Sequence, residues 1–214
     1  MDTLRGVIAK NAAEALFRRA SRQAKKRVAA AEAQVERWVW CKGVWYEHAL
    51  LPFDRYRFLK LPTFHKSEPK QKGQGTQAFG FDGEGRVVLH RSYATPNAYV
   101  ERASAYAKGG SEWTRYRRDG ALLEAAVIQL GPHGITELRM WDWEEVGQHW
   151  KIRYEDGRPT TMMVEQAVPE EPLAKHELSA EWDDEGALVR IQRHDLVWDR
   201  RRVEWERPKA RKRG

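Results

Sequence analysis

Turn signals recur at short intervals over most of the chain, and this spacing restricts the fold more than any other feature of the sequence. From Ala78 onward, nine clusters rich in Gly, Pro, Asn, Asp and Glu follow one another, mostly 10 to 13 residues apart. The runs between the turns are seven to ten residues long, and in one of them Trp150, Ile152 and Tyr154 alternate with charged neighbours. Such alternation is typical of half-buried strands, so the sequence predicts antiparallel strands joined by hairpins.

One segment of this pattern, residues 97 to 107, has two readings. Thr95 and Pro96 could open a short helix that Gly109 ends, or the segment could be another strand. With a strand in this place, about ten strands follow one another between residues 78 and 206. A meander of that length closes into a barrel or remains a strongly twisted open sheet. We therefore expect a mainly β (α+β) fold built on an antiparallel up-and-down β-meander.

Several of these turns share a register in which an aromatic residue stands three or four positions before a glycine. The four units are Phe81 to Gly85, Tyr116 to Gly120, Tyr154 to Gly157 and Trp182 to Gly186. The segment 79–88, Phe-Gly-Phe-Asp-Gly-Glu-Gly-Arg-Val-Val, resembles the hairpin units of tyrosine-aspartate (RHS-type) or tryptophan-glycine repeat proteins. This resemblance covers about half of the chain and implies successive hairpins, without implying an activity.

A long amphipathic helix is expected before the strands begin. Asn11 and Glu14 have the spacing of a capping box, and the pattern predicts a helix from about Ala12 to about Glu36, after a separate leader of residues 1 to 10. One arc of this helix carries small and apolar side chains: Ala13, Leu16, Phe17, Ala20, Ala24, Val28, Ala31 and Val35. Small residues favour close packing on another element, so we expect the helix to dock on the sheet.

The rest of the chain divides by composition. Residues 37–41 and 44–48 are aromatic and β-branched runs around Lys42 and Gly43, which predicts a tight hairpin. Residues 66–77 contain no apolar side chain and are typical of a linker or loop. The predicted organisation is 1–48, a basic helix and first hairpin; 49–77, a loop or linker; 78–206, the β-meander domain; and 207–214, a basic tail.

The net charge of +7 is concentrated at the two ends of the chain. Residues 1 to 42 hold ten Lys and Arg against four Asp and Glu, a net +6, and residues 199 to 214 hold eight against three, a net +5. The middle holds 20 against 24 and is mildly acidic, at −4. A polyanion would therefore be attracted to the ends of the chain.

Two groups of residues at these ends are candidates for binding. On the predicted helix, the arc opposite the apolar stripe carries Arg18, Arg19, Arg22, Lys25 and Lys26. Near the C-terminus, Trp198 and Trp205 flank Arg200, Arg201 and Arg202. Both groups fit contact with a nucleic acid or an acidic protein surface. Each group also has an explanation that involves no partner. The helix cations could form a solvent-exposed helix face, and the C-terminal arginines could protect an edge strand by their charge.

Motifs of catalysis and of metal binding are absent from the sequence. No Gly-x-Ser-x-Gly elbow, phosphate-binding loop or His-Glu-x-x-His spacing is present, so no metal and no cofactor is expected. The single cysteine, Cys41, lies in an aromatic run where a buried, inert thiol is expected. His90, Arg91, Glu101 and Arg102 could meet on neighbouring strands, which leaves a dispersed nuclease-like site open.

The sequence thus favours a non-catalytic binding module that contacts an acidic protein or a nucleic acid, such as an accessory or immunity-type bacterial protein. Two alternatives remain open: a small-ligand carrier in a β-barrel, and a nuclease-like hydrolase with a dispersed site. No apolar run approaches 18 residues, the first residues lack the apolar core of a secretory signal, and one cysteine suits a reducing compartment. A cytoplasmic location is therefore expected.

Overall fold

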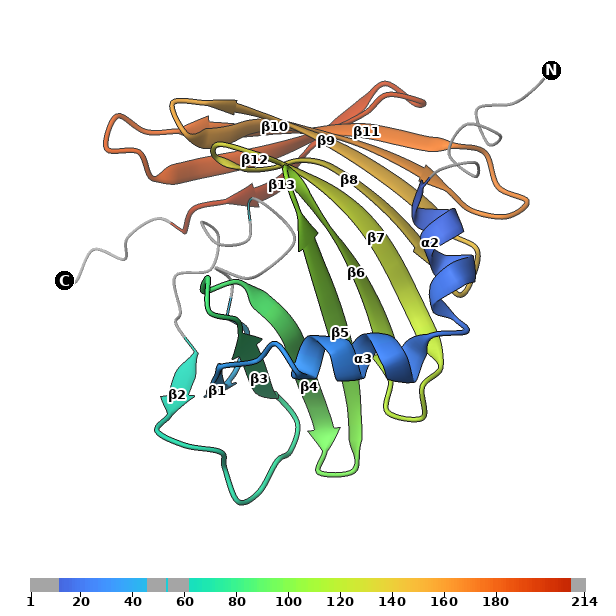
Figure 1. The fold of residues 1–214 in the computed structure, drawn as a ribbon. Coiled ribbons are helices and arrows are strands. Elements are labelled where there is room, and N and C mark those ends of the chain that lie inside the picture. The colour runs from blue at the N-terminus through green and yellow to red at the C-terminus, as the bar shows by residue number, and fades with distance from the viewer. Residues whose placement is uncertain (1–11, 46–52, 54–61, 209–214) are drawn as a thin grey trace.

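One antiparallel sheet of thirteen strands dominates the computed structural model, which describes residues 12–45, 53 and 62–208. The strands follow the order β13-β12-β11-β10-β9-β8-β7-β6-β5-β4-β3-β1-β2, so nearly every neighbour in space is the neighbour in sequence. The sheet is strongly twisted and does not close, which leaves β13 and β2 as its two edges within the described part (Figure 1). The mainly β, up-and-down meander is confirmed in its open form.

The elements have the following bounds. The helices are α2 (Ala12–Ala20) and α3 (Ala24–Glu32); the strands are β1 (Arg37–Lys42), β2 (Thr63–His65), β3 (Thr76–Phe81), β4 (Val87–Thr95), β5 (Ala98–Ala107), β6 (Gly110–Arg117), β7 (Leu122–Gly131), β8 (Gly134–Asp142), β9 (Gly147–Glu155), β10 (Arg158–Ala167), β11 (Ala174–Trp182), β12 (Leu188–Asp195) and β13 (Arg200–Glu206). The ambiguous segment 97–107 is a strand, β5. No helix of the described residues is long and apolar enough to cross a membrane.

The prediction of one long N-terminal helix is wrong, because the chain turns at residues 21–23 and forms two helices of nine residues each. The amide of Gln23 donates to the Ala20 carbonyl, and the Ser21 hydroxyl donates to the Arg18 carbonyl, which ends the first helix. The predicted apolar arc still faces the sheet on both sides of the turn. The turn lets α2 follow β7 and β8 while α3 follows β4 and β5.

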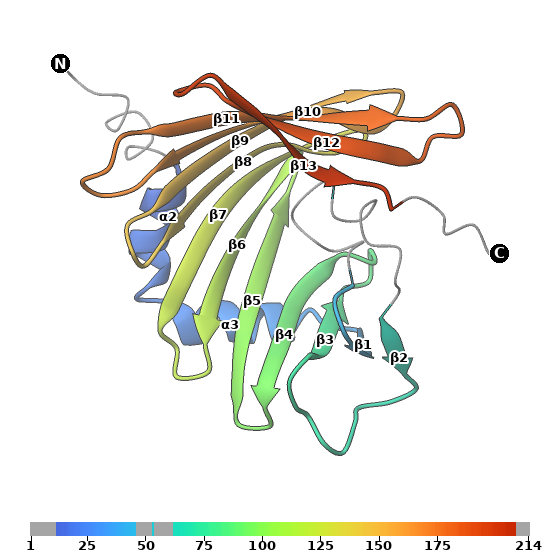
Figure 2. The ribbon, with the colours of Figure 1, turned by 180° about the vertical axis from the view of Figure 1, so that it is seen from behind.

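Small side chains bring the helices close to the sheet. Ala13, Leu16, Ala20 and Ala31 are buried, and Leu16 is 1% exposed. Both helices cover the same face of the sheet, hereafter the helix face, as the view from behind also shows (Figure 2). The docked helix is therefore present, in two pieces.

The largest apolar core lies on the opposite face, over β6 to β12. Trp113 and Trp150 are buried there together with Leu138 and Ile191, and Phe53 reaches this core from outside the sheet. Trp205 packs against the same cluster from β13. Large side chains therefore fill this face.

The predicted hairpin of 37–41 with 44–48 is not the pairing that the structure shows. β1 pairs with β2 on one side and with β3 on the other. Val44 and Trp45 lie outside any strand, and residues 46–48 lie outside the described residues. The amide of Gly43 donates to the Gly75 carbonyl, which extends the pairing of β1 with β3. β3 is buried along its whole length.

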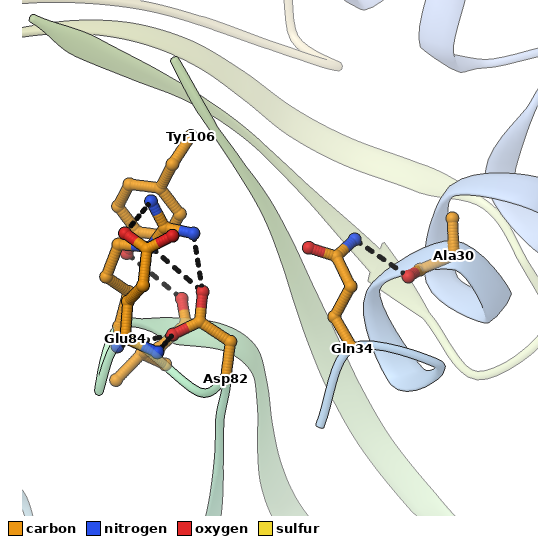
Figure 3. A network of polar contacts seen from close by, with 7 residues as sticks. Ala30, Gln34, Asp82, Glu84 and Tyr106 are labelled. Atoms are coloured by element: carbon orange, nitrogen blue, oxygen red, sulfur yellow. Dashed lines mark hydrogen bonds and ion pairs between the residues drawn. The ribbon is translucent and has the colours of Figure 1, made fainter. Parts of the chain in front are cut away.

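The turn between β3 and β4 shows how the recurrent hairpins are built (Figure 3). Asp82 Oδ1 accepts from the amides of Glu84 and Arg86 at 3.0 and 2.8 Å. Arg86 in turn pairs with Asp82 and Glu84, and its guanidinium lies 4.9 Å from the centre of the Tyr106 ring. One aspartate thus satisfies the turn amides and also fixes the following arginine.

The same turn recurs in two other hairpins of the sheet. Asp142 accepts from the Glu144 and Val146 amides, and Asp183 accepts from the Ala187 amide. In all three turns the residue three positions after the aspartate has a left-handed backbone: Gly85 at φ 75°, Glu145 at φ 61° and Gly186 at φ 78°. Two of the four predicted aromatic-to-glycine units, Phe81 to Gly85 and Trp182 to Gly186, therefore share this turn, and the Asp142 turn has the same structure without the glycine.

Candidate functional site

Three of the cations near the helices are tied to neighbouring carboxylates. Arg18 pairs with Glu14 one turn earlier, with 2.6 Å between Nη2 and Oε1. Arg19 and Arg27 both approach Glu112 of β6, each at 3.5 Å. These ion pairs fasten the helices to one another and to the sheet.

Within the described ranges, the other predicted cations of this arc have no carboxylate partner. Arg22, Lys25 and Lys26 are exposed and form no ion pair with any residue in the described ranges. Of the five predicted helix cations, these three are the ones that are not paired with a described carboxylate.

The turn between β12 and β13 exposes three consecutive apolar side chains. Leu196 is 39% exposed, Val197 is 47% exposed and Trp198 is 68% exposed, the highest value among the large hydrophobic residues that the structure describes. Exposed aromatic side chains of this size are enriched at protein interfaces. Of the two tryptophans predicted as site residues, Trp198 is therefore the exposed one.

Hydrogen bonds hold this turn in one conformation. Asp195 Oδ1 accepts from the amides of Val197 and Trp198 at 3.0 and 3.2 Å, and the Leu196 amide donates to the Lys175 carbonyl. Partial desolvation acts to raise the pKa of Asp195, but the amide donors of Trp198 and Val197 outweigh it and the pKa lies below its ordinary value. Trp198 is therefore presented on a fixed turn.

The strand after this turn is an edge of the sheet with a mixed surface. Arg200, Arg201 and Arg202 are all exposed, and Val203 beside them is 54% exposed. Arg202 Nε donates to Glu204 Oε2 at 3.1 Å. β13 pairs only with β12 among the described strands, so its outer side offers backbone donors and acceptors to another strand.

The structure separates the candidate residues into distinct places. Trp205 lies opposite Ile191 and is half-buried against the core, so it supports the hairpin and does not extend the exposed surface. The α2 helix lies on β7 and β8, whereas β13 lies five strands beyond β8, roughly 24 Å along the sheet at ~4.8 Å per strand. The helix cations and the β12–β13 hairpin therefore form two surfaces.

The four residues considered for a dispersed nuclease-like site do lie on neighbouring strands, but they point to two faces. Arg91 pairs with Glu101 across the strands and with Glu32 of α3, at 2.7 and 2.9 Å. His90 and Arg102 are opposite one another on the other face. Each face therefore holds one base opposite one arginine, and the four side chains do not meet in a single site.

The described residues include one cysteine, and its thiol is buried. No group of three His, Cys, Asp or Glu side chains among these residues is arranged to hold a metal ion. Cys41 is fully buried, and burial raises the pKa of its thiol to about 11, as expected for an inert cysteine. Comparison of the chain with family models, curated proteins and solved structures finds no match.

Proposed function

We propose that the chain is a non-catalytic binding module whose β12–β13 hairpin binds an acidic segment of a partner protein. The segment would add as a strand to the open edge of β13, with its carboxylates on Arg200 to Arg202 and an apolar side chain against Trp198. The observation that carries this proposal is the 68% exposed Trp198 on a turn fixed by Asp195. A preorganised aromatic anchor loses little conformational entropy on binding.

The apolar part of the hairpin favours a protein over a nucleic acid as the partner. Leu196, Val197 and Val203 are aliphatic and exposed, and aliphatic side chains provide no flat surface on which bases stack. They do provide area for the apolar side chains of an added strand. The three arginines next to them suit carboxylates, which guanidinium groups bind through paired hydrogen bonds.

The unpaired cations near the helices have a supporting role in this proposal. Arg22, Lys25 and Lys26 lie on a separate surface, so they do not contact a segment bound at β13. Their positive field would draw an acidic partner toward the module and raise its association rate at low salt. Replacing all three with Gln should lower the association rate at low salt and leave the dissociation rate unchanged.

A direct test uses a synthetic peptide of alternating Glu and Val, seven residues long like β13, as a stand-in for the partner segment. Its affinity is measured for the full chain and for the variant Trp198→Ala. Loss of a hot-spot aromatic costs at least ~2 kcal/mol, so the affinity should fall about 30-fold. Trp143→Ala is the matched control, because Trp143 is 63% exposed in another hairpin turn.

Single-stranded DNA and RNA of mixed sequence are titrated alongside the peptide at low and high salt. Peptide binding that depends on Trp198 and not on Trp143, and that exceeds the oligonucleotide binding at high salt, supports the proposal. Equal losses in the two variants would remove the hairpin as the site. Oligonucleotide binding that is tighter than peptide binding would make the module a nucleic-acid-binding protein instead.

A further inference from the structure

A row of four aromatic side chains crosses the helix face on β1, β4 and β5. Consecutive ring centres along the row are 6.1, 6.0 and 5.0 Å apart, in the order Trp38, Trp40, Tyr93 and Tyr99. β3 lies between β1 and β4, and its Ala78, opposite Trp40, is small enough to leave room for the rings. The faces of aromatic rings are electron-rich and attract cations, so this row offers a surface to a positively charged group.

Three cations of the chain lie over these rings, and two of them are fixed by other contacts. The Arg91 guanidinium lies 5.2 Å from the centre of the Trp38 ring, and two glutamates hold it at 2.7 and 2.9 Å. The Arg118 guanidinium lies 5.8 Å from the centre of the Tyr99 ring, and its Nη1 donates to the Asn97 carbonyl at 2.7 Å. Both arginines are therefore built into the surface.

The third cation, Lys72, has no such anchor on the sheet. Its Nζ lies 5.3 Å from the centre of the Trp40 ring and 5.7 Å from the centre of the Tyr93 ring, within the ~6 Å of a cation–π contact. Among the described residues its ion-pair partner is Glu68, which belongs to the same loop between β2 and β3 (Figure 1). The two ring contacts are therefore what holds the Lys72 ammonium to the described sheet.

The loop itself is bonded to the sheet only from Gly73 onward. The Gly73 amide donates to Thr76 Oγ1 at 3.2 Å, and the Thr76 amide donates to the Gly73 carbonyl at 2.9 Å. Residues 66 to 72 form no hydrogen bond with any described strand. The side chain of Lys72 is 25% exposed, so its ammonium can leave the rings for water without the loss of a backbone hydrogen bond.

The two rings under Lys72 are arranged to receive one cation together. Their centres are 6.0 Å apart and their planes are inclined by 30°, so the two ring faces adjoin one another. Burial raises the pKa of Tyr93, and the negative charge of Glu68 is among the influences that raise it further, against the opposing charge of Arg91. Glu68 therefore adds a carboxylate beside the rings. Aromatic faces with a nearby negative charge are the groups that bind organic ammonium ions.

We propose that Trp40 and Tyr93 form a binding site for a quaternary ammonium group, and that Lys72 occupies this site until such a ligand displaces it. The primary ammonium of a lysine is strongly hydrated, whereas a quaternary ammonium loses little hydration when it moves onto aromatic rings. The ligand therefore has an advantage over Lys72. The site lies on β1 and β4, toward the end of the sheet opposite β13, and does not depend on the function proposed for the β12–β13 hairpin.

The test uses choline as the probe and NMR of the full-length chain labelled with ¹⁵N as the readout. Ring currents should move the methyl signal of bound choline upfield, and the indole N–H signal of Trp40, assigned with Trp40→Phe, should shift as choline binds. The uncharged analogue of choline, in which carbon replaces the nitrogen, should bind about 10-fold more weakly because it lacks the charge. Acetylated trimethyllysine carries the same head group, so the tighter of these two ligands identifies a small molecule or a modified protein as the source.

The matched variants are Lys72→Ala and Lys70→Ala, each of which removes one positive charge from the same loop. Lys72→Ala also vacates the rings, so it should bind choline about 10-fold more tightly than the wild type does, as expected if Lys72 fills the site about 90% of the time. Its dissociation constant should be about 1 mM or tighter. Lys70→Ala should bind choline as the wild type does. In the Lys72→Ala background, Glu68→Gln should weaken choline several-fold, and Tyr93→Leu should weaken it more than Tyr93→Phe does.

Equal affinities of Lys72→Ala and Lys70→Ala for choline would overturn the proposal, because Lys72 would then not fill the site. The absence of an upfield shift in the methyl signal of choline would also overturn it, as would equal binding of the uncharged analogue. These outcomes do not depend on the folding of the ring variants, because both lysines lie in a loop outside the helices and strands.

Discussion

Replacing Arg102 with methionine should stabilise the protein. Removing a charge that is buried without a partner, and filling its place with an apolar side chain of similar length, can gain ~1–4 kcal/mol. Arg102 Nε is fully buried, but the residue as a whole is half-buried beside a cavity, so the lower part of this range applies. We expect a gain of about 1–2 kcal/mol in the free energy of unfolding, or about 2–8 °C in Tm for a chain of this size.

The assay is urea and thermal unfolding of Arg102→Met. Arg115→Met is the control, because Arg115 is paired with Glu124 at 2.9 Å and its loss leaves that carboxylate alone. The pair is partly exposed, so this control should lose up to ~1 kcal/mol. A Tm that falls in Arg102→Met as well would show that Arg102 has a stabilising partner in the folded chain, which would refute the reasoning.

Three further outcomes follow from local structure. Glu145→Gly should raise stability by about 0.5–1 kcal/mol, because Glu145 has φ 61° where two equivalent turns have glycine, while Gly85→Ala should lower it by a similar amount; chemical denaturation measures both. Burial and the nearby Arg193 lower the pKa of His176 in the folded chain below its ordinary 6.5. As the pH falls, His176 is therefore protonated in the unfolded chain before it is protonated in the folded chain. The free energy of unfolding should consequently fall as the pH drops below about 6.5. Between about pH 7 and pH 5, the Tm of His176→Gln should therefore decrease less than the Tm of the wild type. The Tm of His133→Gln, a change at an exposed histidine, should decrease as much as that of the wild type. Cys41 should react with a thiol reagent only as the protein unfolds, because it is buried with a pKa of about 11; immediate reaction of the native chain would contradict its place in the core.

Local patterns predicted the strands well, because each hairpin is specified by a few adjacent residues. The Asp82 and Asp183 turns carry their own hydrogen bonds, so the register seen in the sequence is the register of the structure. The apolar arc from Ala13 to Val35 also identified the buried face of the helices. It did not identify the turn at residues 21–23, since the arc is continuous through it and no Gly or Pro marks it.

Contacts between distant segments could not be predicted in the same way. β1 pairs with β3 across more than thirty residues of chain, and no local signal distinguishes that partner from the nearer run 44–48. Arg102 likewise lies between His90 and Arg115 of the neighbouring strands, with no carboxylate directly opposite it.

Hydrogen exchange of the backbone amides, measured with and without the Glu-Val peptide, tests the binding hairpin most directly. Addition of a strand at the edge gives the outward amides of β13 new acceptors, so slower exchange should appear in residues 200–206 and in the turn that holds Trp198. The same experiment on Trp198→Ala should show little of this protection. Protection centred on α2, α3 and the turn at residues 21–23, with none along β13, would contradict the hairpin as the site of binding.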